Sequence, residues 1–349
     1  MILPLQPRTR LKCEHAKKTN FPLHSERAPM IFRTVVDAPK YPFALEPGEG
    51  IVHLGSCFSQ HMASQLRKHL FRVAENPFGT SFNPVSIAQQ VEKLQSPTPY
   101  KPHELTFHRG LFFSFDHYSV FSHPDKDQCL AGINRSLSRA GRMLISGKLL
   151  MITLGTAHAW KHKKTGKLVN NCHRLPGNEF ERILLSVQEI TKELTKSLLL
   201  LQKTHPHLHV LLSVSPVRHW RDGAMGNLRS KSHLIAAVHR VVEEVEQAHY
   251  FPSYEIMMDD LRDYRFYADD LLHPNELAVQ YIWEAFAASV LSKKSREWIK
   301  DFQPLLSFVN HRPNWPDSPD HEANKRKHNT LYRTLKARYK EADWAAFGE

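Results

Sequence analysis

Short apolar runs alternate with amphipathic stretches along the middle of the chain. Residues 50–55 form an apolar run that ends at a glycine, and residues 149–155 and 209–214 form two further runs of the same kind. Continuous apolar runs of this length are typical of strands that are covered on both faces. The pattern therefore predicts a parallel sheet buried between layers of helices.

Between these runs, apolar residues recur every three or four positions, which is the spacing of an amphipathic helix. The longest such stretch covers residues 180–201, and Pro274 is suited to the first turn of a final helix. Strands alternating with helices over residues 50–292 predict a three-layer α/β/α sandwich with a mainly parallel, flavodoxin-like sheet and right-handed crossovers. The helical patterns begin near Met62, Phe180, Asn227 and Pro274, and residues 250–251 and 254–258 are predicted to be extended.

The chain divides into parts that differ in pattern. Residues 45–292 carry the alternating strands and helices and form the predicted domain. Residues 97–128 are rich in aromatic residues, His and Pro, and we interpret them as an irregular insertion near the cleft. Residues 1–44 are predicted to form an N-terminal arm, and residues 293–349 a basic extension that ends in a helix over 329–347.

Positive charge is concentrated at the two ends of the chain. The net charge is +12, and residues 1–40 hold eight Lys or Arg against three Asp or Glu, while residues 293–349 hold twelve against eight. A basic surface attracts phosphate without a specific site. Because the middle of the chain is nearly balanced, the distribution favours solvated tails over a nucleic-acid-binding surface.

The chain lacks the patterns of a membrane, secreted or zinc-finger protein. No run of about 18 apolar residues is present to cross a bilayer, and residues 1–18 lack the apolar core of a signal peptide. We therefore expect a cytoplasmic protein with no membrane partner. The four cysteines are far apart and form no C-x-x-C pair, so they are predicted to be free thiols: Cys13, Cys57, Cys129 and Cys172.

No metal or other cofactor is expected. The 23 histidines include no H-E-x-x-H pair and no comparable ligand spacing. A metal site formed by His158, Cys172 and His173 is the weaker alternative, because scattered histidines are usually solvated or packed.

Chemically capable residues gather at one edge of the predicted sheet. In an open α/β sheet, ligands bind beyond the carboxyl ends of the strands, where loops carry exposed side chains. A thiol or hydroxyl at a strand-to-helix turn is exposed, and the positive end of the helix stabilises its anion. The residues that fall at this edge are Ser56 and Cys57, Gly155 to His158, Arg218 and His219, and Asp270 and His273.

These residues supply the parts of a nucleophilic site. Cys57 or Ser56 can attack, although attack at neutral pH needs a neighbouring base, for which histidine is the usual choice. His273 fits that role, and Asp270 can hold its imidazole in the required tautomer. The position of this D-x-x-H immediately before Pro274 strengthens the interpretation.

The turn Gly55-Ser56-Cys57-Phe58 resembles the signature of the bacterial GSCFA family, with Ser59 where that signature has alanine. The resemblance extends over roughly residues 45–290. Further matching segments are Asn76 to Pro84, Thr153 to Ala157, Asn171 to His173, Ser213 to His219, and Tyr250 through Pro274.

That family is similar to the SGNH/GDSL hydrolases, which act mainly on esters and acyl groups. The resemblance implies an SGNH-type acyl or ester hydrolase or acyltransferase, with Cys57 at the nucleophile position, Ser56 where aspartate is usual, and Asp270 and His273 as the closing pair. It implies a small-molecule or carbohydrate-linked acyl ester as substrate. The oxyanion-hole asparagine has no counterpart, because Ala157 occupies its position. The substitutes considered are Asn171 or Asn76, together with the backbone N–H groups of Cys57 and Gly79.

Each candidate also has a purely structural interpretation. Cys57 is equally suited to be a small buried thiol, and Ser56 to cap the helix that follows. Arg218, His219 and Arg262 are candidates for binding an anionic substrate group, but a plain salt bridge would explain them equally well. A non-catalytic binding module on the same fold is the alternative to an enzyme, and neither the oligomeric state nor the substrate follows from the sequence.

Overall fold

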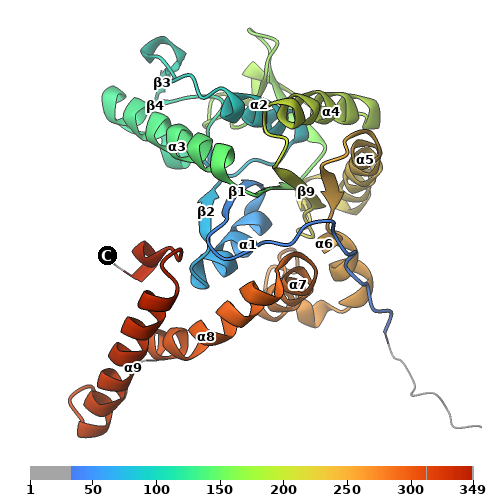
Figure 1. The fold of residues 1–349 in the computed structure, drawn as a ribbon. Helices are drawn as coiled ribbons and strands as arrows, with labels where there is room; N and C mark the ends of the chain where they lie inside the picture. The colour runs from blue at the N-terminus through green and yellow to red at the C-terminus, as the bar shows by residue number, and fades with distance from the viewer. Residues whose placement is uncertain (1–32, 312, 348–349) are drawn as a thin grey trace, which may run out of the picture. The chain divides into compact units, whose positions relative to one another are not determined.

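The computed structural model describes residues 33–311 and 313–347 of the chain. Its centre is a five-stranded parallel sheet with the strand order β10-β9-β5-β1-β2 (Figure 1). Numbered along the chain, this is the 2-1-3-4-5 order of flavodoxin-like folds, so the predicted fold class is confirmed. The strands of this sheet are β1 (Gly50–Gly55), β2 (Arg72–Glu75), β5 (Leu149–Leu154), β9 (His209–Val214) and β10 (Ala248–Tyr250). Residues 1–32 of the predicted N-terminal arm, with Cys13, lie outside the described residues.

Helices cover both faces of the sheet, because alternate strand residues point in opposite directions. Within β1, Ile51 packs in one hydrophobic cluster, whereas Val52 and Leu54 pack in another. The first cluster joins the sheet to α1, α7 and α8, and the second joins it to α2, α3, α4 and α5. These helices are α1 (Cys57–Lys68), α2 (Pro84–Gln95), α3 (Lys126–Ser146), α4 (Val187–Thr204), α5 (Gly223–Glu244), α7 (Glu276–Val290) and α8 (Lys293–Asn310).

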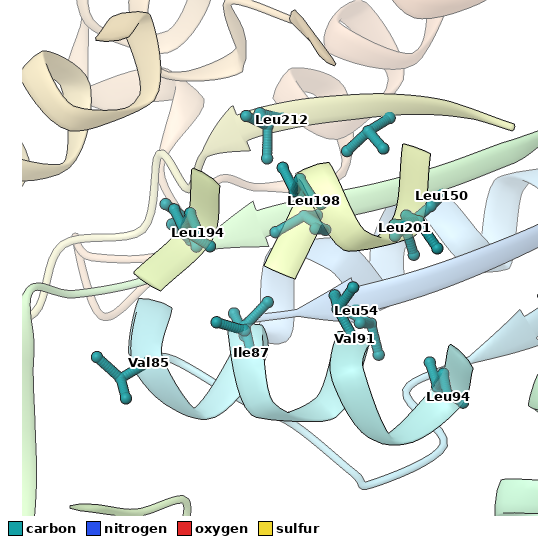
Figure 2. Packing of buried hydrophobic residues seen from close by; sticks show 14 of the residues in the cluster. Leu54, Val85, Ile87, Val91, Leu94, Leu150, Leu194, Leu198, Leu201 and Leu212 are labelled. Atoms are coloured by element: carbon teal, nitrogen blue, oxygen red, sulfur yellow. The ribbon is translucent and has the colours of Figure 1, made fainter. Parts of the chain in front are cut away.

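Leucine-rich packing fills the layer between the sheet and the pair α2 and α4. Figure 2 shows Leu194, Leu198 and Leu201 of α4 among strand residues such as Leu150 and Leu212, with the apolar side chains of α2 beside them. All five of these leucines are fully buried. Complete burial of such side chains stabilises the fold by about 1.5–3 kcal/mol each, which holds the strand ends in fixed positions.

Two small antiparallel sheets lie outside the central sheet. The region predicted as an irregular insertion, residues 97–128, contains the short hairpin β3 (Thr106–His108) and β4 (Leu111–Phe113). It also contains the 3₁₀ turns Pro102–Glu104 and Ser119–Phe121. The second small sheet has the order β7-β6-β8 and follows β5; its strands are β6 (His158–His162), β7 (Leu168–Val169) and β8 (Phe180–Leu184).

The prediction of one helix over residues 180–201 is wrong in its first part. Phe180–Leu184 is strand β8, which pairs with β6, and α4 begins only at Val187. The Ser186 hydroxyl oxygen accepts a hydrogen bond from the Glu189 N–H, and the Glu189 carboxylate accepts one from the Ser186 N–H. This capping box fixes the start of the helix, so the apolar residues before it are free to pair as a strand.

Two further predictions differ from the structure. Residues 254–258 are helical rather than extended, in the turn α6 (Ser253–Glu255) and the π-helix Ile256–Asp260. The adjacent residues Ile256 and Met257 both pack in the cluster that contains α7, whereas a strand would turn them to opposite faces. The C-terminal helix α9 (Pro319–Arg338) starts and ends earlier than the predicted 329–347, because Ser318 caps it and Tyr339 ends it.

The C-terminal extension packs against the domain. Trp298 and Phe302 of α8 are fully buried in the cluster that holds Phe58 of α1. The Trp298 indole N–H donates to the His69 carbonyl at the end of α1, and the Asp343 N–H donates to the Leu70 carbonyl, just before the 3₁₀ turn Trp344–Phe347. Within the described ranges, no helix is both long and apolar enough to cross a membrane.

Candidate functional site

The turn between β1 and α1 brings Cys57 to the carboxyl edge of the sheet. Gly55 ends β1 with φ of +144°, and a Cβ at this position would lie 2.3 Å from the Thr153 carbonyl oxygen. Only glycine accommodates both conditions. The Ser56 N–H donates to the same carbonyl, and Cys57 follows as the first residue of α1, where its thiol meets the positive end of the helix.

His273 and Asp270 approach Cys57 from the loop before α7. The His273 Nε2 atom lies 3.7 Å from the Cys57 Sγ atom. The other ring nitrogen, Nδ1, lies 2.6 Å from the Asp270 Oδ2 atom. The three side chains therefore form a chain of polar contacts from thiol to imidazole to carboxylate, although Cys57 and His273 lie 216 positions apart.

The loop itself holds Asp270 in place. Its Oδ1 atom accepts hydrogen bonds from the backbone N–H groups of Leu272 and His273, at 2.9 and 3.0 Å. The bend passes through Leu271, which has φ of +58°. Hydrogen bonds lower the pKa of Asp270 to about 2, because they stabilise its carboxylate. They come from the backbone N–H groups of His273 and Leu272 and from the His273 ring. Asp270 is therefore a carboxylate at neutral pH.

Cys57 is partly buried, and its environment sets its protonation. Burial raises the pKa of the Cys57 thiol above its ordinary value, and this effect exceeds the lowering by the Phe58 and Cys57 backbone N–H groups and by the charge of Lys231. The thiol is therefore protonated at neutral pH. Because the thiolate is the nucleophilic form, attack requires a base, and His273 is the imidazole within contact distance.

Ser56, the other nucleophile considered, occupies a different environment. Its side chain is fully buried, and its hydroxyl has no hydrogen-bond partner among the described residues. It stands at the N-cap position of α1 but forms no side-chain cap. The side chain in contact with the His273 imidazole is therefore that of Cys57, not that of Ser56.

The oxyanion donors suggested by the sequence are engaged in other hydrogen bonds. The Gly79 N–H donates to the Asn76 carbonyl, and the Asn76 side-chain amide donates to Ser59 while its Oδ1 accepts from the Gly55 N–H. The Asn171 side-chain amide donates to Ser119. A role for these groups as oxyanion donors stays a prediction, and it would require the exchange of the hydrogen bonds seen here.

Ala157 occupies the position where the resemblance to the SGNH/GDSL hydrolases would place an asparagine donor. Its side chain is fully buried, and its backbone N–H donates to Ser230 Oγ at 2.8 Å. Neither group of Ala157 is therefore available to an oxyanion.

Arg218 and His219 lie near the site, whereas Arg262 is tied elsewhere. The Arg218 N–H donates to the Leu272 carbonyl in the loop of His273, and its guanidinium lies 4.7 Å from the centre of the Tyr267 ring. His219 is mostly buried, with its Nε2 atom unpartnered among the described residues, and burial lowers its pKa to about 4. The exposed Arg262 pairs with Asp259 at 2.5 Å.

The sequence interpretation did not identify a buried polar cluster on the first turns of α5. Asn227, Ser230 and Lys231 lie on the face that continues into Leu234 and Ala237. Asn227 Oδ1 accepts a hydrogen bond from the His219 N–H, and Ser230 Oγ accepts one from the Ala157 N–H. Lys231 donates to backbone carbonyls at the ends of two strands. The sequence did contain a signal for this cluster: three polar residues at positions i, i+3 and i+4 lie on the face of the helix that is otherwise apolar.

A groove adjoins the loop of His273, between α1 and α7. Its volume is about 1020 Å³, and Ala268 and Pro274, which flank the loop, help to line it. Burial lowers the pKa of His61, and the charge of the nearby His273 lowers it further. The other side chains on the α1 and loop sides are mainly polar: Ser64, Gln65, Lys68, Asp269 and Glu276.

The described residues support neither the metal alternative nor a disulfide. Across residues 33–311 and 313–347, no three His, Cys, Asp or Glu side chains are grouped so that they could hold a metal ion. Cys57, Cys129 and Cys172 are free thiols. His173 instead shares a hydrogen bond with the Ser114 carbonyl and stacks on Phe113.

One comparison with known proteins, the match to a family model, agrees with the motif at the β1 turn. The model of the GSCFA family matches residues 50–286. A protein of Streptococcus pneumonia, provisionally described as a platelet activating factor, is 11% identical with a TM-score of 0.36, and the match covers 70% of this chain and 84% of that one. A carbohydrate esterase family 2 enzyme with a carbohydrate binding domain, from Corynascus thermopiles (Myceliophthora fergusii), is 16% identical with a TM-score of 0.33, covering 71% and 67%. A comparison with curated proteins gave no match.

Proposed function

Because the chain belongs to the GSCFA family, and because Cys57, His273 and Asp270 form one chain of polar contacts, we propose that it is an SGNH-type acyl or ester hydrolase or acyltransferase. The observation that carries the proposal is the 3.7 Å approach of the His273 Nε2 atom to the Cys57 Sγ atom. A thiol in contact with an imidazole is the starting arrangement for base-assisted attack.

In the first half-reaction, the Cys57 Sγ attacks the carbonyl carbon of an acyl ester while His273 takes the thiol proton. The new S–C bond displaces the carbonyl π electrons onto oxygen. When the oxyanion collapses, the ester C–O bond breaks and His273 gives its proton to the departing alkoxide. The products are an alcohol and a thioester on Cys57, and Asp270 orients the imidazole and stabilises its cation.

In the second half-reaction, His273 takes a proton from water as the water oxygen attacks the thioester carbon. The intermediate breaks the S–C bond, a carboxylic acid leaves, and the proton on His273 returns to the Cys57 sulfur. A second alcohol in place of water would give an acyltransferase by the same steps. Which acceptor is used depends on what enters the groove beside the loop.

Backbone donors at the start of α1 are the best-supported partners for the oxyanion. The Cys57 and Phe58 N–H groups face the sulfur closely enough to lower its pKa, and they occupy the first helical turn, where backbone donors have no partner within the helix. An oxygen bound to the carbon that Cys57 attacks would lie near the same donors. Each such donor is worth about 3 kcal/mol of transition-state stabilisation.

The groove beside the site supports our proposal for the substrate class. Hydroxyl, amide and charged side chains on α1 and the 268–276 segment suit a hydroxyl-rich leaving group, such as a small polar alcohol or a carbohydrate that carries the acyl ester. Arg218, near the same loop, remains a candidate for binding an anionic substituent.

Hydrolysis of short p-nitrophenyl esters and of acetylated oligosaccharides tests the proposal. We expect Cys57→Ala to reduce the rate at least a thousandfold, about the scale of losing a nucleophile, and Ser56→Ala to retain a nucleophilic thiol and measurable turnover. Cys172→Ala is the matched control, since Cys172 is also a free, half-buried thiol. Equal rates for the wild type and Cys57→Ala would refute the proposal.

One observation favours a non-catalytic binding module as the second candidate. The usual asparagine donor is replaced by Ala157, whose own N–H is held by Ser230, and the Gly79 N–H is also occupied. This candidate predicts that acetylated oligosaccharides bind, as measured by calorimetry, without turnover and without dependence on Cys57.

A further inference from the structure

A fully buried lysine lies under the site. Lys231 projects from the third turn of α5, and only 1% of its surface is exposed. Its Nζ atom donates to the Gly155 carbonyl at 2.8 Å and to the Ser215 carbonyl at 2.6 Å. Gly155 directly follows β5 and Ser215 directly follows β9, so one amine joins the carboxyl ends of two adjacent strands.

The joined strands are neighbours of the strand that carries the nucleophile. β5 pairs with β1, and Gly55, the residue two positions before Cys57, stands opposite Thr153 of β5. The Gly155 N–H donates to the Phe82 carbonyl, and the Gly55 carbonyl accepts from the Ser81 N–H. The position of Lys231 is therefore linked to the turn of Cys57 through one layer of backbone contacts.

Lys231 lacks the carboxylate that usually accompanies a buried ammonium group. In the described part of the chain its Nζ makes no ion pair, and it lies 5.9 Å from the centre of the Tyr254 ring. Buried charges are normally paired, so a cation here needs negative charge that arises during function. Cys57 is the ionisable group whose negative charge would favour the cationic form of Lys231.

We propose that Lys231 is a positioning residue of the site, which joins β5 to β9 beneath the cleft and stabilises negative charge on the Cys57 sulfur through its own positive charge. The catalytic consequence of this proposal rests on the proposed function. In that mechanism, negative charge forms on sulfur as His273 removes the thiol proton and again when the thioester S–C bond breaks. The proton stays on Lys231 throughout, and no bond to Lys231 forms or breaks.

The amine can change its charge without losing its structural contacts. Burial lowers the pKa of Lys231 to about 7. A neutral amine still has two N–H bonds, one for each carbonyl, and protonation adds a third. Other charged or ionisable groups also act here: Asp270 raises the pKa of Cys57, and Lys231 lowers the pKa of His219. Cys57 and Lys231 are thus expected to titrate as a coupled pair.

The test is the pH profile of Cys57 alkylation by iodoacetamide, followed on the Cys57 peptide by mass spectrometry from pH 6 to 10. In Lys231→Met we expect the midpoint to rise by about one pH unit, so that alkylation below the midpoint slows about tenfold. Lys231→Gln keeps an N–H₂ donor group without the charge, and the same shift is expected. Lys203→Met, which removes an exposed lysine on α4, is the matched control and should leave the profile unchanged.

The variants separate charge from packing. A profile shifted in Lys231→Met but normal in a folded Lys231→Gln would assign Lys231 to hydrogen bonding alone and overturn the proposal, as would unchanged midpoints in both. Circular dichroism establishes that each variant is folded. Because alkylation needs no ester turnover, its outcome is independent of the Cys57→Ala hydrolysis assay, so failure of the proposed function and failure of this inference can be told apart.

Discussion

The outer and inner sides of the site are built by different means. On the outer side, Asp270 and His273 lie three positions apart on one loop, with side chains 46% and 43% exposed. On the inner side, Ser230 and Lys231 are buried and reach residues 73 and 76 positions away in the chain. The outer side is oriented by contacts within a few residues, whereas the inner side depends on the packing of α5 against the sheet.

This difference separates the consequences of substitution. An exposed, locally bonded pair contributes little to stability, because solvent screens its interaction. A buried donor or acceptor costs free energy whenever it is left without a partner. We therefore expect changes on the outer side to affect turnover and leave the fold intact, and changes on the inner side to affect both.

The largest expected effect is on the outer side. His273→Ala removes the base, and ester hydrolysis should fall about a thousandfold. The thermal unfolding midpoint should stay within the error of the wild-type value, measured by circular dichroism. His103→Ala, an exposed histidine in the 97–128 region, serves as the control. A large fall in stability for His273→Ala would show that the two sides are not separable.

Asp270→Asn should have a smaller effect on the same side. Asparagine keeps an oxygen for the Leu272 and His273 N–H groups but loses the carboxylate that orients and stabilises the imidazolium. We expect kcat to fall about a hundredfold, less than for a fully buried triad aspartate, with KM little changed. Steady-state kinetics with p-nitrophenyl acetate measures both constants, and an unaltered kcat would remove Asp270 from the mechanism.

Ser230→Ala sharpens the comparison from the inner side. The variant leaves the buried Ala157 N–H without its acceptor, and the free energy of unfolding should fall by about 1–3 kcal/mol. Urea unfolding measures the change. Ser232→Ala is a matched control two residues along α5, because Ser232 is exposed and its hydroxyl donates to the Leu228 carbonyl of the same helix. A loss for Ser230→Ala no larger than the control's would contradict the assignment.

Over a single pH unit, the smallest effect is a pH dependence of the free energy of unfolding that comes from Lys231. Burial lowers its pKa to about 7, below the unfolded value of about 10.4, so the unfolded chain binds more protons between these limits. Stability should therefore rise with pH by about 1.4 kcal/mol per unit from about pH 7 upward, relative to Lys231→Met. The measurement is urea unfolding at several pH values in a Cys57→Ala background, where no thiolate forms. A difference that does not vary with pH would argue against the low pKa.

The central strands and the outer side could be predicted because their signals are local. Continuous apolar runs mark β1, β5 and β9, and Asp270 and His273 are close in sequence before a capped helix. The boundaries of the helices were harder to predict from the sequence. The helix pattern over residues 180–201 includes β8, although Ser186 and Glu189 already formed a recognisable capping box.

The inner side could not be predicted from local pattern alone. Lys231 becomes notable only when β5, β9 and α5 are packed together, since its two acceptors come from separate strand ends. Ile256 and Met257 present a similar case, because the choice between strand and helix there depends on a shared contact with α7. Tertiary packing, rather than propensity, decides such segments.

The backbone contacts of Leu45 join two segments that lie far apart in the chain. Its N–H donates to the Val290 carbonyl, and its carbonyl accepts from the Ser292 N–H and the Ser295 hydroxyl. The two ends of the predicted domain, residues 45–292, therefore meet side by side. An engineer could splice this region into an exposed loop of a host protein, or join its ends and open it elsewhere, without stretching the chain.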